Sequence, residues 1–236
     1  SKGIGAATAQ MLAKAGAKIT AVSRNPEELI STLSGSGHTA VSLDLENQES
    51  IGKFISSIEE CHILINNAAG PPGGPLLDNE IKDFEAPFKR HLHAAHTLVR
   101  GIAPMMEEAG MGRIVNIIST SVREPIPNIG LSNTLRGAMA SWSKTLSREL
   151  PSCITINNVL PGFTDTDRLG SLAASINAKT GKSVEEVHSG WMAQVPIGRL
   201  IDPLETGAAI AYLCMPIAGG IRGVSLAVDG GRMRSI

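Results

Sequence analysis

The feature that most constrains the fold is a regular alternation of short apolar segments and longer helix-forming segments along the 236 residues. The short segments are rich in Val and Ile and apolar on both faces, which is typical of parallel strands covered by helices. The strands are expected at residues 18–23, 40–43, 63–66, 114–118, 154–159 and 224–228. This alternation predicts an α/β fold, a doubly wound parallel sheet in three α-β-α layers.

The helices between these strands are marked by composition and by their end signals. Residues 6–15 are small and helix-forming, and Gly16 stands where that helix ends. Asn25-Pro26 predicts a helix start, with Pro at the first helical position. Longer helices are expected at residues 79–109, 131–150 and 204–214. The whole chain, 1–236, is expected to form one α/β domain.

Composition narrows the classes of partner. The formal net charge is −1, so no basic field attracts nucleic acid or an anionic membrane. No apolar run approaches the ~18–20 residues that span a bilayer. The three cysteines are scattered, without metal or disulfide spacing, which favours a reducing, cytoplasmic setting. A small-molecule partner is the class that these observations favour.

The N-terminal stretch Ser1-Lys2-Gly3-Ile4-Gly5 opens the first predicted helix and is a candidate pyrophosphate site. Backbone N–H groups converge at a helix N-terminus, and glycine permits close approach of a phosphate. A simple strand-to-helix turn is the alternative.

The end of the next predicted strand indicates which dinucleotide binds. Sites that select NAD usually place Asp or Glu there for the ribose 2′-hydroxyl. Here Ser23 and Arg24 stand at that position, with Lys2 in the glycine turn, so NADP(H) is favoured over NAD(H). An ordinary solvated surface charge is the alternative for Arg24.

Several motifs together resemble the short-chain dehydrogenase/reductase family, in particular 3-oxoacyl-carrier-protein reductases. The glycine turn looks like the end of the family's glycine-rich loop. Further motifs follow in the family's order: Asp44-Leu45, Asn66-Asn67-Ala68-Ala69-Gly70, Arg113-Ile-Val-Asn-Ile-Ile-Ser119, Pro161-Gly162-Phe163-Thr164-Asp165-Thr166 and Val228-Asp229-Gly230-Gly231. These motifs in register over one domain are strong evidence for the fold.

The resemblance implies roles for the cofactor residues. Asp44 would accept a hydrogen bond from the adenine amino group, with Leu45 beside it. Asn66, Asn67 and Ala68 would lie along the cofactor near the carboxyl edge of the sheet. The segment from Pro161 and Gly162 onward would flank the nicotinamide, with Thr164 or Thr166 near its carboxamide.

The catalytic positions depart from the family pattern, which is a Ser, a Tyr thirteen residues later and a Lys four residues after that. Ser119 is present, but Ser132 replaces the Tyr and Arg136 replaces the Lys. A serine hydroxyl is a far weaker acid than a phenol, and arginine cannot relay a proton. The chain therefore lacks the family's ordinary proton donor.

His91 stands where the family places an Asn on the preceding helix. As a histidine, it is expected to titrate near neutrality and could serve as the acid; a packed helix histidine is the alternative. His91, His93 and His96 cannot share one metal ion, because residues two apart point about 200° apart on a regular helix.

Four further expectations concern the whole protein. The family's first strand would precede Ser1, so we expect the given chain to lack a central strand and to be a fragment. Residues 163–198 are expected to form a lid over a substrate. A homo-oligomer, either tetramer or dimer, is what the resemblance implies. Two functions remain: an NADP(H)-dependent carbonyl or alcohol oxidoreductase, and a catalytically degenerate dinucleotide-binding sensor or inert subunit.

Overall fold

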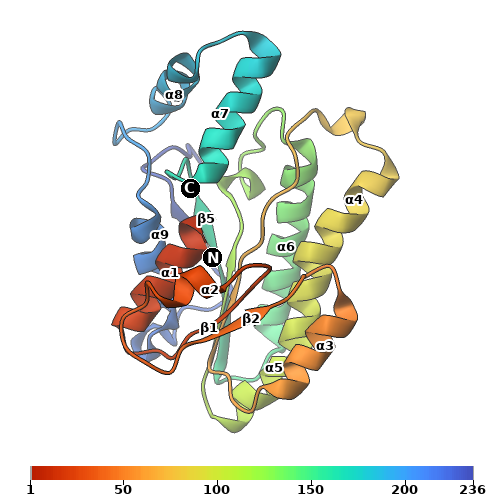
Figure 1. Cartoon of the computed structure of the whole chain (residues 1–236), viewed down its shortest axis with the longest axis vertical. Helices are drawn as coiled ribbons and strands as arrows, with labels where there is room; N and C mark the ends of the chain where they lie inside the picture. Colours follow the sequence, from red (N-terminus) through yellow and green to blue (C-terminus); the bar gives the residue numbers. More distant parts are fainter. Residues whose placement is uncertain (1, 236) are drawn as a thin grey trace.

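The computed structural model describes residues 2–235 and has the predicted α/β arrangement in three layers (Figure 1). All described strand pairs are parallel, in two sheets ordered β1-β2 and β3-β4-β5-β6. The strands are β1 (Thr20–Ser23), β2 (Thr39–Ser42), β3 (Ile63–Asn66), β4 (Gly112–Ile117), β5 (Ile154–Pro161) and β6 (Ser225–Val228). Each one overlaps a strand predicted from the sequence.

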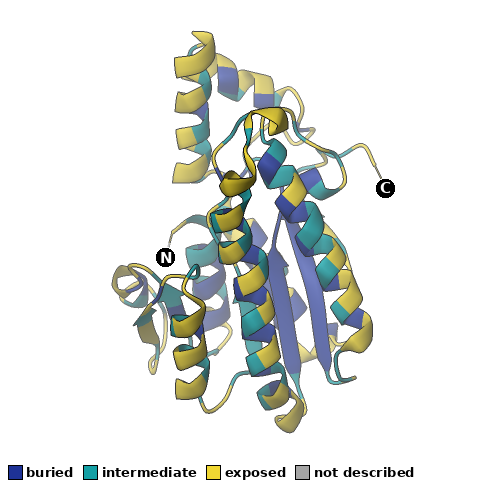
Figure 2. Ribbon diagram, turned by 90° about the vertical axis from the view of Figure 1, so that its right-hand side faces the viewer, coloured by how far each residue is buried: buried dark blue, intermediate teal, exposed yellow. Residues whose placement is uncertain are grey.

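Helices cover both faces of the four-stranded sheet (Figure 1). One face carries α1 (Gly3–Lys14) and α9 (Pro203–Cys214), and the other carries α3 (Gln48–Ser57), α5 (Ala94–Glu108) and α6 (Gly130–Glu149). Central strands β4 and β5 are buried along their whole length, as Figure 2 shows. Successive residues serve opposite layers: Ile114 packs with α3 and α5, whereas Val115 packs with α1 and α9. This double burial explains why these strands show no polar alternation.

Two helix predictions were wrong in detail. The expected helix from Asn25-Pro26 is a single turn, α2 (Glu27–Ile30), with Pro26 before its first residue. The expected helix 79–109 is α4 (Ile81–Phe88), a π-helical turn (Lys89–His93) and α5. Pro87 has no N–H for the helical ladder, and the wider π turn follows it directly.

A pair of helices, α7 (Asp167–Thr180) and α8 (Val184–Met192), projects beyond the sheet at the top of Figure 1. Their small core contains Ala173, Val187 and Trp191. The ring of Phe163 stacks on Trp191 at a centroid distance of 5.2 Å. The guanidinium of Arg232 also lies over the Phe163 ring, 4.8 Å from the ring centroid. Most of the remaining surface of α7 and α8 is exposed (Figure 2).

The C-terminal segment contacts the loop that follows β4. The backbone N–H groups of Arg234 and Ser235 both donate to Glu124 Oε1, at 2.7 and 2.8 Å. Among residues 2–235, no helix combines the length and the apolarity that crossing a bilayer demands.

Candidate cofactor and active site

The glycine turn lies against two loops, one that follows β3 and one that follows β5. Gly3 has φ +54°, and a Cβ built there would lie 3.1 Å from Thr166 Cγ2. A Cβ on Gly5 would lie 2.5 Å from Asn67 Nδ2. The fold therefore brings the start of α1, the loop after β3 and the loop after β5 to one place. Ser1, also predicted to bind the cofactor, lies outside the described residues.

The end of β1 carries a polar group without a partner. Ser23 Oγ is covered from solvent and has no hydrogen-bond partner among residues 2–235. The backbone of its neighbour Arg24 is fixed, because Ser42 Oγ donates to the Arg24 carbonyl at 3.0 Å. The Arg24 side chain is exposed, as is Lys2. A buried unpaired hydroxyl is uncommon in folded proteins.

Asp44 and Leu45 follow β2. Asp44 Oδ1 accepts a hydrogen bond from the backbone N–H of Glu46 at 3.0 Å, which leaves Oδ2 for another donor. Leu45 lines a small cavity of about 20 Å³, together with Asn66, Asn67, Ala68, His91 and Arg136 among others. The predicted cofactor and catalytic positions therefore share one continuous region.

A ladder of side-chain amides crosses the sheet at this level. Asn66 Nδ2 donates to Asn116 Oδ1 at 2.8 Å, Asn116 Nδ2 donates to Asn158 Oδ1 at 3.0 Å, and Asn158 Nδ2 donates to Ser225 Oγ at 3.1 Å. The four residues are register partners on β3, β4, β5 and β6. Sequence reasoning missed the ladder; an Asn near the same level in three predicted strands was the available signal. It satisfies polar groups in the core and fixes Asn66 where β3 ends.

The loop after β5 leads into the projecting helices. Gly162 is required by close packing, since a Cβ there would lie 2.7 Å from Asp229 Cα. Thr164 is buried, and its hydroxyl donates to the Gly162 carbonyl at 3.2 Å. Thr166 is the N-cap of α7, accepting from Leu169 N at 3.4 Å. Pro161 ends β5 itself, so this loop begins at the carboxyl edge of the sheet.

Ser119 and Ser132 present hydroxyls at the same edge. Ser119 Oγ accepts from Ser121 N at 3.1 Å at the start of a short 3-10 turn, so its own O–H proton remains free to donate. Ser132 is half-buried on the first turn of α6. No hydrogen bond of the Ser132 hydroxyl is recorded within residues 2–235, so it too can serve a ligand.

The Arg136 side chain points into the protein, toward β4. Its side chain is buried, and Nη1 donates to the Ile117 carbonyl at 2.9 Å. Burial, together with the nearby positive charge of Arg168, lowers the pKa of the guanidinium to about 10. Arg136 thus keeps its charge at neutral pH, and one face of it is already used by the protein.

The prediction that His91 titrates near neutrality was wrong. Burial, followed by the charge of Arg136 and then of Arg90, lowers the pKa of the imidazole to about 3. Nε2 lies 2.9 Å from the Ala69 carbonyl, which can only accept, so Nε2 carries the proton of the neutral ring. His91 is a packed, neutral histidine in the π turn, and this state does not suit a general acid near pH 7.

A metal site is the remaining role for histidines in this region. Among residues 2–235, no group of three or more His, Cys, Asp and Glu side chains is arranged to hold a metal ion.

A dinucleotide fits the residues at this edge. Its phosphates would lie at the positive-φ glycine at the start of α1, and its ribose end would lie near Ser23 and Arg24. The fold and this edge define the class of dinucleotide-binding α/β oxidoreductases.

Comparison with known proteins gives the family. A family model described as enoyl-(acyl carrier protein) reductase matches residues 1–232. The chain belongs to the short-chain dehydrogenase/reductase family, whose members are NAD(P)-dependent oxidoreductases.

Three relatives illustrate the similarity. The 3-oxoacyl-[acyl-carrier-protein] reductase FabG of Vibrio cholerae is 32% identical over 240 aligned positions, covering 98% of this chain and 93% of the relative. The crystal structure of YwfH, an NADPH-dependent reductase of bacilysin biosynthesis, superposes with a TM-score of 0.92 at 26% identity, covering 100% and 96% of the two chains. L-Sorbose reductase from Gluconobacter frateurii, complexed with NADPH and L-sorbose, superposes with a TM-score of 0.91 at 25% identity, covering 100% and 94%.

Proposed function

We propose that this protein is an NADP(H)-dependent reductase of the short-chain type, acting on a carbonyl or alcohol substrate as 3-oxoacyl reductases do. The observation that carries the proposal is the convergence of Gly3, Gly5, Asn67 and Thr166 beside an unpaired Ser23 hydroxyl. The bound nicotinamide supplies or accepts the hydride. The residues of the chain bind the cofactor and orient the substrate.

The preference for NADP(H) rests on charge at the end of β1. Arg24 and Lys2 are exposed cations, and Ser23 brings no carboxylate to repel a 2′-phosphate. Guanidinium groups bind phosphates in a bidentate manner, which suits Arg24 to this role. The relatives YwfH and L-sorbose reductase, both described with NADPH, are consistent with this preference.

The substrate oxygen is polarised by hydroxyl donors rather than by a phenol. Ser119 keeps its O–H proton free because its oxygen accepts from Ser121 N, and Ser132 adds a second hydroxyl from α6. The charge of Arg136 favours a developing alkoxide nearby. Neither hydroxyl is acidic enough to give up its proton, so the proton comes from water, and the reaction is slow.

The missing general acid lowers the rate of hydride transfer by a limited factor. A positioned general acid is typically worth ~10²–10⁴ in rate. Holding two reactants in the correct geometry can lower the barrier by ~7–11 kcal/mol. Hydride transfer therefore persists at a reduced rate when the acid is missing but the cofactor and substrate are held in place.

The helices α7 and α8 form the lid in this proposal. Arg168, in the first turn of α7, donates from Nη2 to the Pro71 carbonyl at 2.7 Å. This bond joins the lid to the loop after β3, across the mouth of the cofactor edge. A lid held in this way shields the reacting groups from bulk water.

The proposal is tested by cofactor titration and turnover on the same protein. NADPH fluorescence titration is expected to give an affinity at least several-fold tighter than NADH. Oxidation of NADPH is then followed over a panel of ketones, enones and aldehydes. Equal affinity for the two nucleotides would contradict the NADP(H) assignment, and tight binding without turnover would contradict the reductase assignment.

One observation favours a second function, a dinucleotide-binding sensor or inert subunit. The charged and titratable groups at the catalytic positions are bound to backbone carbonyls: Arg136 to Ile117 and His91 to Ala69. A site with no proton donor near pH 7 still binds a cofactor. Tight NADPH binding with no turnover on any carbonyl is the result that this second function requires.

A further inference from the structure

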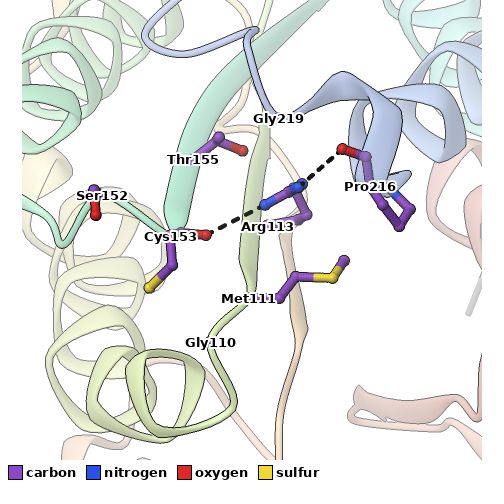
Figure 3. Close-up of a pocket in the computed structure, with 8 residues that line it drawn as sticks. All are labelled: Gly110, Met111, Arg113, Ser152, Cys153, Thr155, Pro216 and Gly219. Atoms are coloured by element: carbon purple, nitrogen blue, oxygen red, sulfur yellow. Dashed lines mark hydrogen bonds between the residues drawn. The ribbon is translucent and has the colours of Figure 1, made fainter.

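A second cavity opens at the amino-terminal edge of the sheet, away from the cofactor edge (Figure 3). Its volume is about 320 Å³, at the lower end of the ~300–1,000 Å³ typical of small-ligand pockets. Its walls come from the loop before β4, the first residues of β5 and the turn after α9: Gly110, Met111, Arg113, Ser152, Cys153, Thr155, Pro216 and Gly219. Nothing in the cofactor chemistry uses these residues.

The guanidinium of Arg113 spans this cavity (Figure 3). The side chain is buried, with 6% of its residue surface exposed. Its donors reach only neutral carbonyls: Nη1 contacts Gly112 O at 2.9 Å and Cys153 O at 3.4 Å, Nε contacts Met215 O at 3.4 Å, and Nη2 contacts Pro216 O at 3.4 Å. Three of these four bonds are long, so the donors are weakly satisfied.

The charge of Arg113 has no counter-ion in the described structure. No carboxylate within residues 2–235 forms an ion pair with it. The nearby Cys214 does not serve, since burial raises the pKa of its thiol to about 12 although the charge of Arg113 opposes that rise. A buried, unpaired cation is costly unless an anion or a strong acceptor approaches it.

Thr155 provides the second, independent observation. It is the register partner of Arg113 on the neighbouring strand, so both side chains leave the same face of the sheet. Thr155 is 2% exposed, lines the cavity, and its Oγ1 has no hydrogen-bond partner among residues 2–235. A charge without a counter-ion and a hydroxyl without a partner therefore lie side by side.

Glycine at position 219 leaves room beside the guanidinium. A Cβ there would lie 3.3 Å from Arg113 Nη2 and 3.2 Å from Pro216 O. Any larger residue would crowd the face of the guanidinium on which a ligand would bind.

We propose that this cavity is a binding site for a small phosphate, held by the Arg113 fork with Thr155 as a supporting donor. Arginine forks match phosphate oxygens in a bidentate manner, and the hydroxyl is both donor and acceptor. The phosphate is either free or part of a small monoester, because the shared chemistry is the tetrahedral oxyanion. The site lies at the edge of the sheet opposite the cofactor, so it is independent of nicotinamide nucleotide binding.

The test follows thermal unfolding of the protein against increasing inorganic phosphate, with chloride at equal ionic strength as the reference. Methyl phosphate forms the second arm, which separates free phosphate from a monoester. If both phosphate and methyl phosphate raise the melting temperature, the site accepts a monoester. If inorganic phosphate alone raises it, the site is specific for the free ion. No stabilisation by either ligand beyond chloride overturns the proposal.

Three variants locate the effect. Thr155→Val keeps the shape and is expected to weaken the apparent phosphate affinity about three- to tenfold, the value of one hydrogen bond. Arg113→Lys removes the fork and is expected to weaken it more than about tenfold. Arg24→Gln, at the cofactor edge, is expected to keep the part of the phosphate stabilisation that Thr155→Val and Arg113→Lys weaken. Loss in Arg24→Gln but not in Thr155→Val would place the phosphate at the cofactor edge and refute the proposal.

A crystal soaked in selenate gives a reading that does not depend on variant stability. The expected result is an anomalous peak within hydrogen-bond distance of the Arg113 guanidinium. If no peak appears there, Arg113 only caps the last carbonyls after α9, and the proposal fails.

Discussion

The glycine turn and the catalytic positions lie at the same edge of the sheet, yet they treat their polar groups in opposite ways. At the glycine turn, Gly3 and Gly5 keep side chains away, and Ser23 Oγ is left unpaired. At the catalytic positions, Arg136 and His91 are bound to the carbonyls of Ile117 and Ala69. The polar group at the glycine turn has no partner within the protein, whereas the side chains at the catalytic positions already form hydrogen bonds with backbone carbonyls.

This difference separates binding from proton chemistry. A protein that kept the catalytic scaffold unchanged would present a free cation and a titratable acid beside the nicotinamide. Here the cation is turned toward β4, and the imidazole is neutral. The hydroxyls of Ser119 and Ser132 are the groups that remain available to a substrate oxygen.

The largest expected effect comes from restoring the acid. The paired change Ser132→Tyr with Arg136→Lys is expected to raise NADPH-dependent carbonyl reduction by about 100-fold, within the ~10²–10⁴ value of general acid catalysis. The phenol supplies the proton, and the positive charge of the lysine ammonium lowers the pKa of the phenol. Initial rates on the carbonyl panel at saturating NADPH measure the gain.

Each single change is the control for the pair. Ser132→Tyr alone lacks the cation in the right place, and Arg136→Lys alone lacks the acid, so neither is expected to exceed a few-fold gain. If the pair gains nothing while NADPH still binds, the scaffold no longer positions the substrate, and the sensor function is favoured.

The next effect concerns acid stability. The pKa of His91 is lowered from 6.5 to about 3 in the folded protein, so the unfolded chain binds this proton more tightly. The stability from His91 is therefore present above pH 6.5 and is lost as the pH falls toward 3. Between pH 7 and pH 5 the free energy of unfolding is expected to fall by about 2 kcal/mol from this residue alone.

Urea unfolding at several pH values measures this loss. His91→Gln retains a donor for the Ala69 carbonyl and does not titrate, so its unfolding free energy should depend less on pH over that window. His93→Gln, in the same π turn but exposed, reports the effect of replacing a surface histidine. The same slope in wild type and His91→Gln would show that His91 titrates normally in the folded protein.

The local sequence pattern was sufficient to predict most strands and helices. It failed where contacts between residues distant in the sequence determine the structure. β3 was predicted to the residue, because Ile63–Asn66 is a short apolar run between polar segments. The helix expected over residues 79–109 was divided, because the consequence of Pro87 depends on how the chain repacks after it. The alternation of strand and helix did not reveal which side chains meet.

The candidate sites show the same limit. The glycine turn and Ser23 could be placed because they stand at fixed offsets from a strand and a helix. The pKa of His91 could not, since it is set by burial and by Arg136, which is 45 positions along the chain. The Arg113 cavity was missed because it depends on the register of β4 with β5. Register and burial are tertiary properties that spacing alone does not encode.

Exchanging the cofactor preference is expected to have a smaller effect. Ser23→Asp places a carboxylate where a 2′-phosphate would bind, and it accepts from a free 2′-hydroxyl. The ratio of NADPH to NADH affinity is expected to fall about tenfold or more, reversing a several-fold preference. Fluorescence titration of both nucleotides measures the ratio, and Ser23→Ala, which removes the hydroxyl without adding a charge, is the control. An unchanged ratio would mean that the end of β1 does not contact the ribose.

The smallest effect tests whether the lid belongs to the binding region or to the catalytic one. Arg168→Met removes the bond from α7 to the Pro71 carbonyl but keeps the length and apolar stem of the side chain. Because Arg168 is largely exposed, the bond is worth little, and KM for the carbonyl is expected to rise about two- to fivefold with kcat nearly unchanged. Arg168→Lys, which retains a charged donor, should recover most of the loss. A fall in kcat at constant KM would instead show that Arg168 acts on the reacting groups through its charge on Arg136.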